Sequence, residues 1–162
     1  MILWKTVKEG FIADVNVGRL ARRLRMLGYD TLFINGAEDD ELIRIALREG
    51  RILLTRDTGI MERRVVTTGK AKAVLIESDD VKAQLRQVVK GLNLEPDSAP
   101  FSRCMECNVP LIPRAREEVR DLVPPYVFKT QNQFMQCPDC KRIFWRGTHW
   151  EKMLEEIGEL GN

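Results

Sequence analysis

The stretch ILLTRDTGI, residues 52–60, joins an apolar run to an abrupt polar end. Its first three side chains favour a buried strand, and Thr55, Arg56 and Asp57 follow at once. Two roles are open for the carboxylate of Asp57. It can cap a short helix that begins at Thr58, or it can be one ligand of an acidic site at the end of a parallel sheet.

Short apolar runs alternate with amphipathic segments on both sides of this stretch. In chain order, the runs and segments cover residues 11–13, 17–27, 31–34, 39–49, 51–55, 73–77 and 81–92. Gly28 and Gly50 stand where two of the helices are expected to end. Strands that are linked by helical crossovers form a parallel sheet, so the pattern predicts an α/β fold with helices on both faces of the sheet.

The chain is long enough for one ordinary domain and a second, small one, because it has 162 residues, of which 44% are hydrophobic. The Pro- and Ser-containing stretch 96–102 is expected to be a linker between a sheet domain, residues 1–95, and a tail domain, residues 103–162. The 26 basic and 24 acidic residues nearly balance. Any nucleic-acid binding must therefore come from local patches rather than from the net charge of +2.

Membrane insertion is not expected, because no segment approaches the roughly 18 uninterrupted apolar residues that a membrane-spanning helix needs. The expectation is a soluble cytoplasmic protein. In a reducing compartment cysteines more often bind metals than form disulfides.

Four cysteines form two Cys-x-x-Cys pairs, Cys104 with Cys107 and Cys137 with Cys140. Two such pairs that face each other give the tetrahedral Cys₄ geometry that structural Zn²⁺ prefers, with no open position for chemistry. The tail has little that can form a core, so a metal is expected to stabilise it as a zinc ribbon, with a helix or insertion at residues 114–123. Unligated buried cysteines and a redox dithiol are the alternatives.

Three aspartates are expected at one edge of the sheet. Asp14 ends the first apolar run, Asp57 follows the third, and Asp39 opens the second helix. If the strand order is 2-1-3-4, the first and third strands are neighbours and their carboxyl ends meet. Each aspartate can also be a simple helix cap, although Asn16 is the better placed cap for the first helix.

Several stretches together resemble the PIN-like RNase family that is named after the C-terminal domain of the Mut-seven exonuclease. They are FIADVNVGRLARRLRMLGYDT, EDDELIRIALREGRILLTRDTGI, AVLIESDD, CMEC and CPDCKRIFWRGTHW. The resemblance covers nearly the whole chain and implies a PIN-like fold with an appended zinc ribbon. It also implies divalent-metal-dependent cleavage of RNA, with Mg²⁺ or Mn²⁺ held by Asp14, Asp39 and Asp57. Asp79 or Asp80 is a further candidate.

Carboxylate-held metal ions suit phosphodiester hydrolysis, because they stabilise the charge that develops on the phosphate oxygens. The single histidine, His149, lies in the tail, so the sheet domain has no histidine to act as a base. Beside the acids, the candidates for contacts with RNA are Asn16, Arg19, Arg22 and Arg56. Each of these has an ordinary alternative as a helix cap or a solvated side chain.

In the tail, Arg142, Trp145 and Arg146 combine cations for phosphates with a flat ring for stacking on an unpaired base. The alternative is that the rings of this segment form the small core of the ribbon. A non-catalytic RNA- or ribosome-binding adaptor is the main rival function, with a ribosome or an RNA-processing protein as partner. A phosphohydrolase of the haloacid dehalogenase type fits poorly, because Asn16 occupies the position of its second aspartate.

Overall fold

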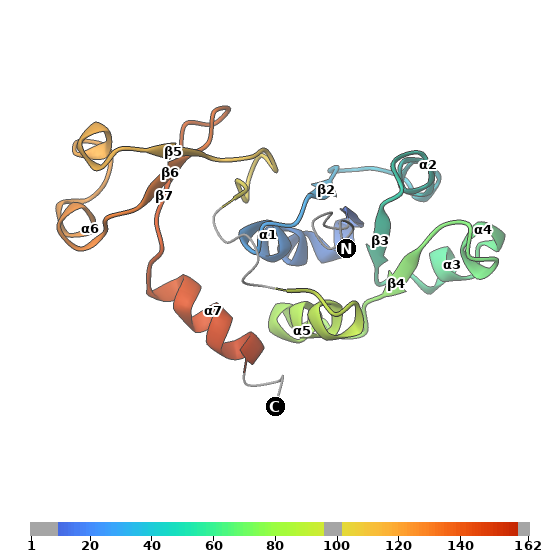
Figure 1. Cartoon of the computed structure of the whole chain (residues 1–162). Coiled ribbons are helices and arrows are strands. Elements are labelled where there is room, and N and C mark those ends of the chain that lie inside the picture. The colour runs from blue at the N-terminus through green and yellow to red at the C-terminus, as the bar shows by residue number, and fades with distance from the viewer. Residues whose placement is uncertain (1–9, 96–101, 159–162) are drawn as a thin grey trace, which may run out of the picture.

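A computed structural model describes residues 10–95 and 102–158, apart from the side chains at 149 and 156–158. Its larger sheet consists of the strands β1 (Phe11–Ala13), β2 (Thr31–Phe33), β3 (Ile52–Thr55) and β4 (Ala73–Leu75). All are parallel and run in the order β2-β1-β3-β4. The predicted α/β fold is therefore confirmed (Figure 1), and the strand order is the one that makes the first and third strands neighbours.

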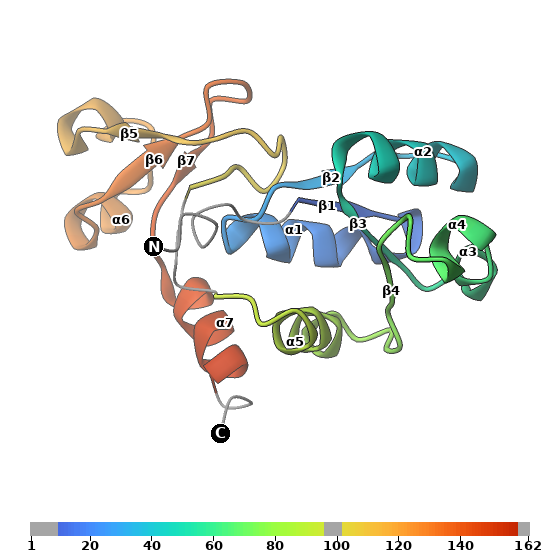
Figure 2. The same ribbon diagram turned by 45° about the vertical axis from the view of Figure 1, so that its right-hand side comes forward.

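Helices cover both faces of this sheet (Figures 1 and 2). In chain order they are the 3-10 helix η2 (Val15–Val17), then α1 (Gly18–Met26), α2 (Asp39–Glu49), α3 (Thr58–Met61), α4 (Arg64–Thr67) and α5 (Val81–Gly91). The first long helix was expected to begin at residue 17, and a 3-10 turn instead precedes it. Gly50 ends α2 as predicted, with the left-handed φ of 65° that glycine adopts without strain.

Alternation along the strands explains why both faces are apolar. Phe11 and Ala13 of β1 pack on the face that α1 and α5 cover, whereas Ile12 packs on the face that α2 covers. Each of these side chains is fully buried. Burial of a large apolar side chain contributes about 1.5–3 kcal/mol, so a strand of this kind must be apolar throughout.

A second, antiparallel sheet lies beyond residue 102 and has the order β5-β6-β7. Its strands are β5 (Ile112–Arg114), β6 (Phe134–Gln136) and β7 (Ile143–Phe144). The 3-10 helix η3 (Arg116–Val119) and the helix α6 (Pro125–Thr130) lie between β5 and β6 in the chain. The insertion expected at residues 114–123 thus contains a short 3-10 helix, and α6 follows it. A small core of Val119, Val123, Val127 and Phe134 supports these turns.

The last helix, α7 (Thr148–Gly158), returns from the ribbon to the larger domain and lies beside α5 (Figure 2). Its residues Trp150 and Met153 are buried in the same cluster as Leu85 and Val88 of α5. Residues 1–9 and 96–101 lie outside the described part of the chain, so the linker at 96–102 stays a prediction. None of the helices in the described residues is long and apolar enough to cross a membrane.

Arg25 joins the two sheets. Only 7% of this residue is exposed. Its Nε donates to the carbonyl oxygen of Thr31 at 2.8 Å, and its Nη1 donates to the carbonyl oxygens of Met105 and Glu106 at 2.9 and 3.1 Å. The guanidinium thus binds the start of β2 and the turn between the first two cysteines at the same time. Three hydrogen bonds to carbonyl oxygens compensate for the burial of its charge.

Asn108 makes the second contact between the ribbon and the sheet. Its Oδ1 accepts from the backbone N–H of Thr31 at 3.0 Å, and its Nδ2 donates to Asp30 at 2.7 Å. Arg51 holds the same carboxylate with two bonds of 2.9 and 3.1 Å. Burial alone would raise the pKa of Asp30, but the hydrogen bonds from Arg51 and Asn108 hold it below the ordinary value. The stability from this contact is therefore present at neutral pH and is lost as the pH falls through the pKa of Asp30.

We expect Arg25→Gln to lower the free energy of unfolding by about 2–4 kcal/mol, because it leaves buried carbonyl oxygens without donors. Arg19→Gln on the same helix is the control, since the side chain of Arg19 is exposed and should matter by less than about 0.5 kcal/mol. Urea unfolding of the zinc-loaded protein measures both changes. Equal stability of the two variants would mean that Arg25 does not join the sheets.

Candidate metal centres and nucleic-acid surface

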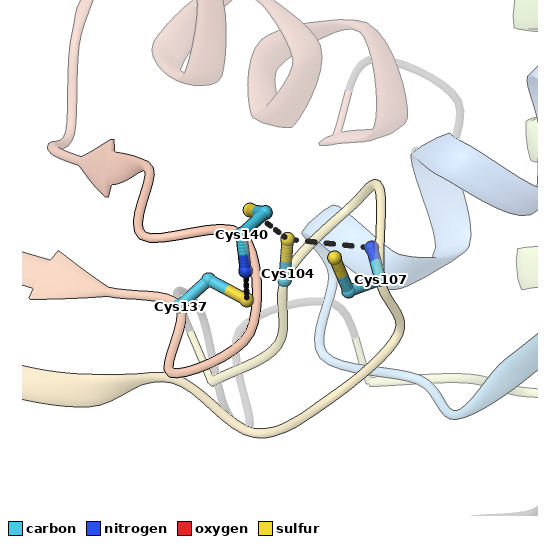
Figure 3. A group of neighbouring side chains, drawn as sticks. All are labelled: Cys104, Cys107, Cys137 and Cys140. Atoms are coloured by element: carbon cyan, nitrogen blue, oxygen red, sulfur yellow. Dashed lines mark hydrogen bonds between the residues drawn. The ribbon is translucent and has the colours of Figure 1, made fainter.

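The four cysteines meet in one cluster between two turns of the ribbon (Figure 3). Their Sγ atoms all lie within 4.8 Å of one another. The distance from Cys104 Sγ to Cys140 Sγ is 3.8 Å. Zn–S bonds of about 2.3 Å in a tetrahedron place the sulfurs about 3.8 Å apart, so the four side chains fit a zinc ion.

Each Cys-x-x-Cys turn directs a backbone N–H at its own first sulfur (Figure 3). The N–H of Cys107 points to Cys104 Sγ, and the N–H of Cys140 points to Cys137 Sγ, both at 3.4 Å. The residue after each pair has a left-handed backbone, with φ of 61° at Asn108 and 65° at Lys141. These N–H groups stabilise negative charge on sulfur, which is the state that binds a metal.

Crowding of the thiols favours a cation at their centre. Burial and the neighbouring sulfurs of Cys140 and Cys137 raise the pKa of Cys107 to about 12. Burial also raises the pKa of Cys104. A bound Zn²⁺ would offset this resistance to deprotonation, because its charge stabilises the thiolates.

Asp14 lies at the carboxyl end of β1 and is almost fully buried, with 4% exposed. Its Oδ1 accepts from the backbone N–H of Val15, and its Oδ2 accepts from the hydroxyl of Thr55, both at 2.7 Å. These bonds fix the carboxylate, while a carboxylate has about four acceptor positions in total. Asp14 therefore acts as the cap of η2 and keeps acceptor capacity for a cation.

Asp57 follows β3 and caps α3. The helix cap was one of the two roles that the sequence left open for this residue. Its Oδ1 accepts from the N–H of Gly59 at 2.7 Å. The backbone N–H of Asp57 donates to the hydroxyl of Thr55 at 2.9 Å, and this hydroxyl in turn donates to Asp14. Thr55 thus links the two strand ends that carry the acids.

Asp39 opens α2 but is not its cap, because Glu38 takes that position. Burial raises the pKa of Asp39, and so do the charges of Asp57 and Asp14, while Arg63 opposes the shift. The three aspartates from separate segments are therefore close enough for their charges to interact. Arg63 forms an ion pair with Asp40 at 3.1 Å, so it is a cation beside this acidic group.

The three carboxylates are more widely spaced than the sulfurs. In the described part of the chain, the cysteines are the one set of three or more such side chains whose ligand atoms all lie within 4.8 Å of one another. Carboxylate oxygens are nevertheless the donors that Mg²⁺ and Mn²⁺ prefer, and after burial the charges of Asp57 and Asp14 contribute to the raised pKa of Asp39. The donor type and the charge thus fit a hard divalent cation.

Thr55 and Arg63 were not among the residues selected from the sequence. Thr55 did have a usable signal, because it is a hydroxyl residue at the last position of a buried strand, two residues before Asp57. Arg63 had no such signal, because it is one of three consecutive charged residues, Glu62 to Arg64, where the chain passes from α3 to α4.

The other candidates in the sheet domain lie around η2 and α1. Asn16 accepts from the backbone N–H of Arg56 at 3.2 Å instead of capping a helix, and the side chain of Arg56 is exposed. A hollow of about 360 Å³ is lined by Asn16 and Arg19 together with Asp79. Arg22 forms an ion pair with Glu106 of the ribbon. Asp80 caps α5 by accepting from the N–H of Ala83.

The three tail candidates make different contacts. Trp145 is half-buried and packs against the small ribbon core. Arg142 pairs with Glu106 at 3.4 Å, and the guanidinium of Arg146 lies 5.6 Å from the centre of the Trp150 ring. The side chain of His149 lies outside the described residues.

The structure thus combines an α/β domain, with acids at the carboxyl ends of its strands, and a four-cysteine ribbon. The family model described as the Mut7-C RNAse domain matches residues 9–157, so the chain belongs to the Mut7-C RNAse domain family. This confirms the resemblance seen in the sequence, gives the chain a ribonuclease-type function and implies an RNA substrate. None of the curated proteins or solved structures compared with the chain matches it.

We expect about one zinc ion per chain by elemental analysis, as the four-ligand geometry requires. Cys104→Ser should remove most of this zinc and unfold the ribbon, because a structural zinc contributes on the order of 10 kcal/mol to the folding of such modules. Zinc content and amide protection in residues 102–147 measure the two effects. A zinc-free chain with a protected ribbon would contradict the expectation.

Proposed function

We propose that this protein is a divalent-metal-dependent ribonuclease that hydrolyses RNA phosphodiester bonds at the carboxyl edge of its parallel sheet. Asp14, Asp39 and Asp57 would hold Mg²⁺ or Mn²⁺, and Cys104, Cys107, Cys137 and Cys140 would hold a structural Zn²⁺. Bound at these carboxylates, a divalent cation supplies charge stabilisation for the phosphate oxygens and lowers the pKa of an attacking water.

The observation that carries this proposal is the placement of the aspartates: Asp14 and Asp57 follow neighbouring parallel strands, and the side chain of Thr55 joins them. Burial raises the pKa of Asp39 of α2, and the charges of Asp57 and Asp14 add to this shift. Like charges that gather from separate segments destabilise a fold unless a cation or a proton compensates for them. Caps alone do not require such a gathering, since each can be satisfied on its own helix.

The side chains around the carboxylates orient this site. Thr55 holds Asp14 through its hydroxyl and Asp57 through the backbone, so two of the acids share one rigid support. Asp14 is buried and cannot rotate into solvent. Arg63 lies near Asp39 and is suited to bind a phosphate oxygen of the substrate, because its present partner, Asp40, is mostly exposed.

Asp39→Asn tests the site. We expect it to lower the rate of RNA cleavage in Mn²⁺ by at least about 100-fold, because a ligand of the cation is lost. The zinc-loaded protein is assayed on labelled single-stranded and structured RNAs, with Mn²⁺ varied. Mn²⁺ should also raise the melting temperature of the wild type more than that of the variant.

Glu41→Gln is the matched control, because Glu41 is exposed in the same first turn of α2. Both changes remove the favourable interaction of an acid with the helix dipole, about 0.3–1 kcal/mol. Only Asp39→Asn also relieves repulsion from Asp57 and Asp14. Since the pKa of Asp39 is raised by folding, the wild type without added Mn²⁺ should lose stability relative to Asp39→Asn as the pH rises through that pKa.

Cleavage by Asp39→Asn at the wild-type rate would mean that the chemistry takes place elsewhere. If neither the wild type nor Asp39→Asn cleaves RNA in Mn²⁺ but both bind RNA, the protein is an RNA-binding adaptor and its aspartates are caps.

A further inference from the structure

A cavity of about 330 Å³ lies where the ribbon meets the larger domain. Its apolar lining comes from three separate parts of the chain. Met26 belongs to α1, Met105 to the first cysteine turn, Phe144 and Trp145 to the end of the ribbon, and Trp150 to α7. The volume is at the lower end of the range of small-molecule pockets, which is about 300–1,000 Å³.

Arginines accompany these apolar groups. Arg103 and Arg142 also line the cavity, and none of its described lining residues is acidic, although Arg142 pairs with Glu106 at 3.4 Å. Arg103 is fixed in place, because its Nη1 donates to the carbonyl oxygen of Asn108 at 2.5 Å. The walls thus combine flat rings with positive charge, which is the composition that holds unpaired bases of an anionic strand.

Phe144 and Trp145 line both this cavity and a second hollow of about 470 Å³. Arg114 and Arg146 line the second hollow, together with the exposed amides Asn132 and Gln133. None of its described lining residues is acidic either. The Trp145 segment therefore borders two hollows whose charged lining residues are arginines.

One face of α1 connects the cavity with the acidic edge of the sheet. Arg19, then Arg22 or Arg23, then Met26 follow each other at the three- or four-residue spacing of a helix face. At one end Arg19 shares a hollow with Asn16, two residues after Asp14. At the other end Met26 lines the cavity.

We propose that the cavity binds one unpaired nucleobase of a single-stranded RNA, and that the arginine face of α1 guides the adjoining phosphates to the carboxylates. This proposal rests on the proposed ribonuclease function. It adds a substrate class, single-stranded RNA, and a fixed spacing between the bound base and the cleaved bond. Cleavage then falls at a constant distance from the base in the cavity.

The length of α1 sets that distance. Its nine residues span roughly 14 Å. A stacked strand advances about 3.4 Å per nucleotide, so the helix spans about four nucleotides, and fewer if the strand is extended. An apolar segment of a partner protein suits the site less well, because two arginines line the cavity and none of its described lining residues is acidic.

Binding is tested first, without added Mg²⁺ or Mn²⁺, on the full zinc-loaded protein. Fluorescence anisotropy is measured with a short single-stranded RNA and with versions that carry one abasic nucleotide at successive positions. We expect abasic substitution at one position to weaken binding about 5- to 100-fold, and substitution elsewhere to change it little. Equal affinity for every abasic RNA would overturn the proposal.

Variants connect this loss to the cavity. Trp145→Ala should weaken the binding of the intact RNA and abolish its sensitivity to the abasic position, whereas Trp145→Phe should largely retain both. Tyr126→Ala is the control, since Tyr126 is an exposed ring on α6 away from both hollows. If Trp145→Ala loses its zinc, the abasic series and Trp145→Phe still decide the question. Full abasic sensitivity in a folded Trp145→Ala protein would overturn the assignment of the cavity.

The path along α1 has its own readout. Arg23→Gln should reduce the slope of log affinity against log salt by about 0.7, the value for one phosphate of a single strand. Arg48→Gln, on the outer face of α2, should leave the slope unchanged. Equal slopes for the two variants would exclude α1 as the path.

Cleavage in Mn²⁺ tests the fixed spacing. In RNAs with one natural base among abasic nucleotides, the cut should move with that base at a fixed offset of a few nucleotides. A cut whose position ignores the base would overturn the proposal. If no RNA is cut but one base position and Trp145 still determine binding, the ribonuclease function fails and the assignment of the cavity is supported.

Discussion

The buried guanidinium of Arg25 is the contact on which the arrangement of the two sheets depends. An arginine without partners at this depth would destabilise the fold, so its three carbonyl acceptors must all be in place. Two of those carbonyls belong to the turn that holds Cys104 and Cys107. The same bonds therefore set the position of the four cysteines, of the ribbon cavity and of the exposed face of α1 relative to one another.

Much of this architecture follows from the sequence. Apolar runs of three or four residues between amphipathic segments specify a parallel sheet, and paired cysteines specify a metal cluster. The contact between the sheets could not be predicted in this way. Arg25 is one of four arginines within seven residues, and its two acceptors in the ribbon lie 80 and 81 positions further along the chain. Sequence periodicity describes one element at a time, whereas such a contact depends on where two elements meet.

The acidic site shows a similar division. The positions of Asp14 and Asp57 at neighbouring strand ends follow from the βα pattern and the strand order. Capping and cation binding looked like alternatives in the sequence, yet a carboxylate that accepts one N–H bond keeps other lone pairs. A cap in fact fixes the orientation of a carboxylate, which is useful for a ligand. The sequence places a hydroxyl at Thr55, but only the structure shows that this hydroxyl supports both acids.

The return of α7 to the larger domain has a consequence for how the ribbon folds. Arg25 and Asn108 fasten its beginning, and Trp150 and Met153 fasten its end in the core of the other domain. The ribbon is therefore a closed loop with two anchored ends rather than a free tail. Because the ends of such a loop are already held together, ordering it requires less chain entropy than ordering an unattached segment of the same length. A short module with four thiols and a small core gains from this anchorage before any metal binds.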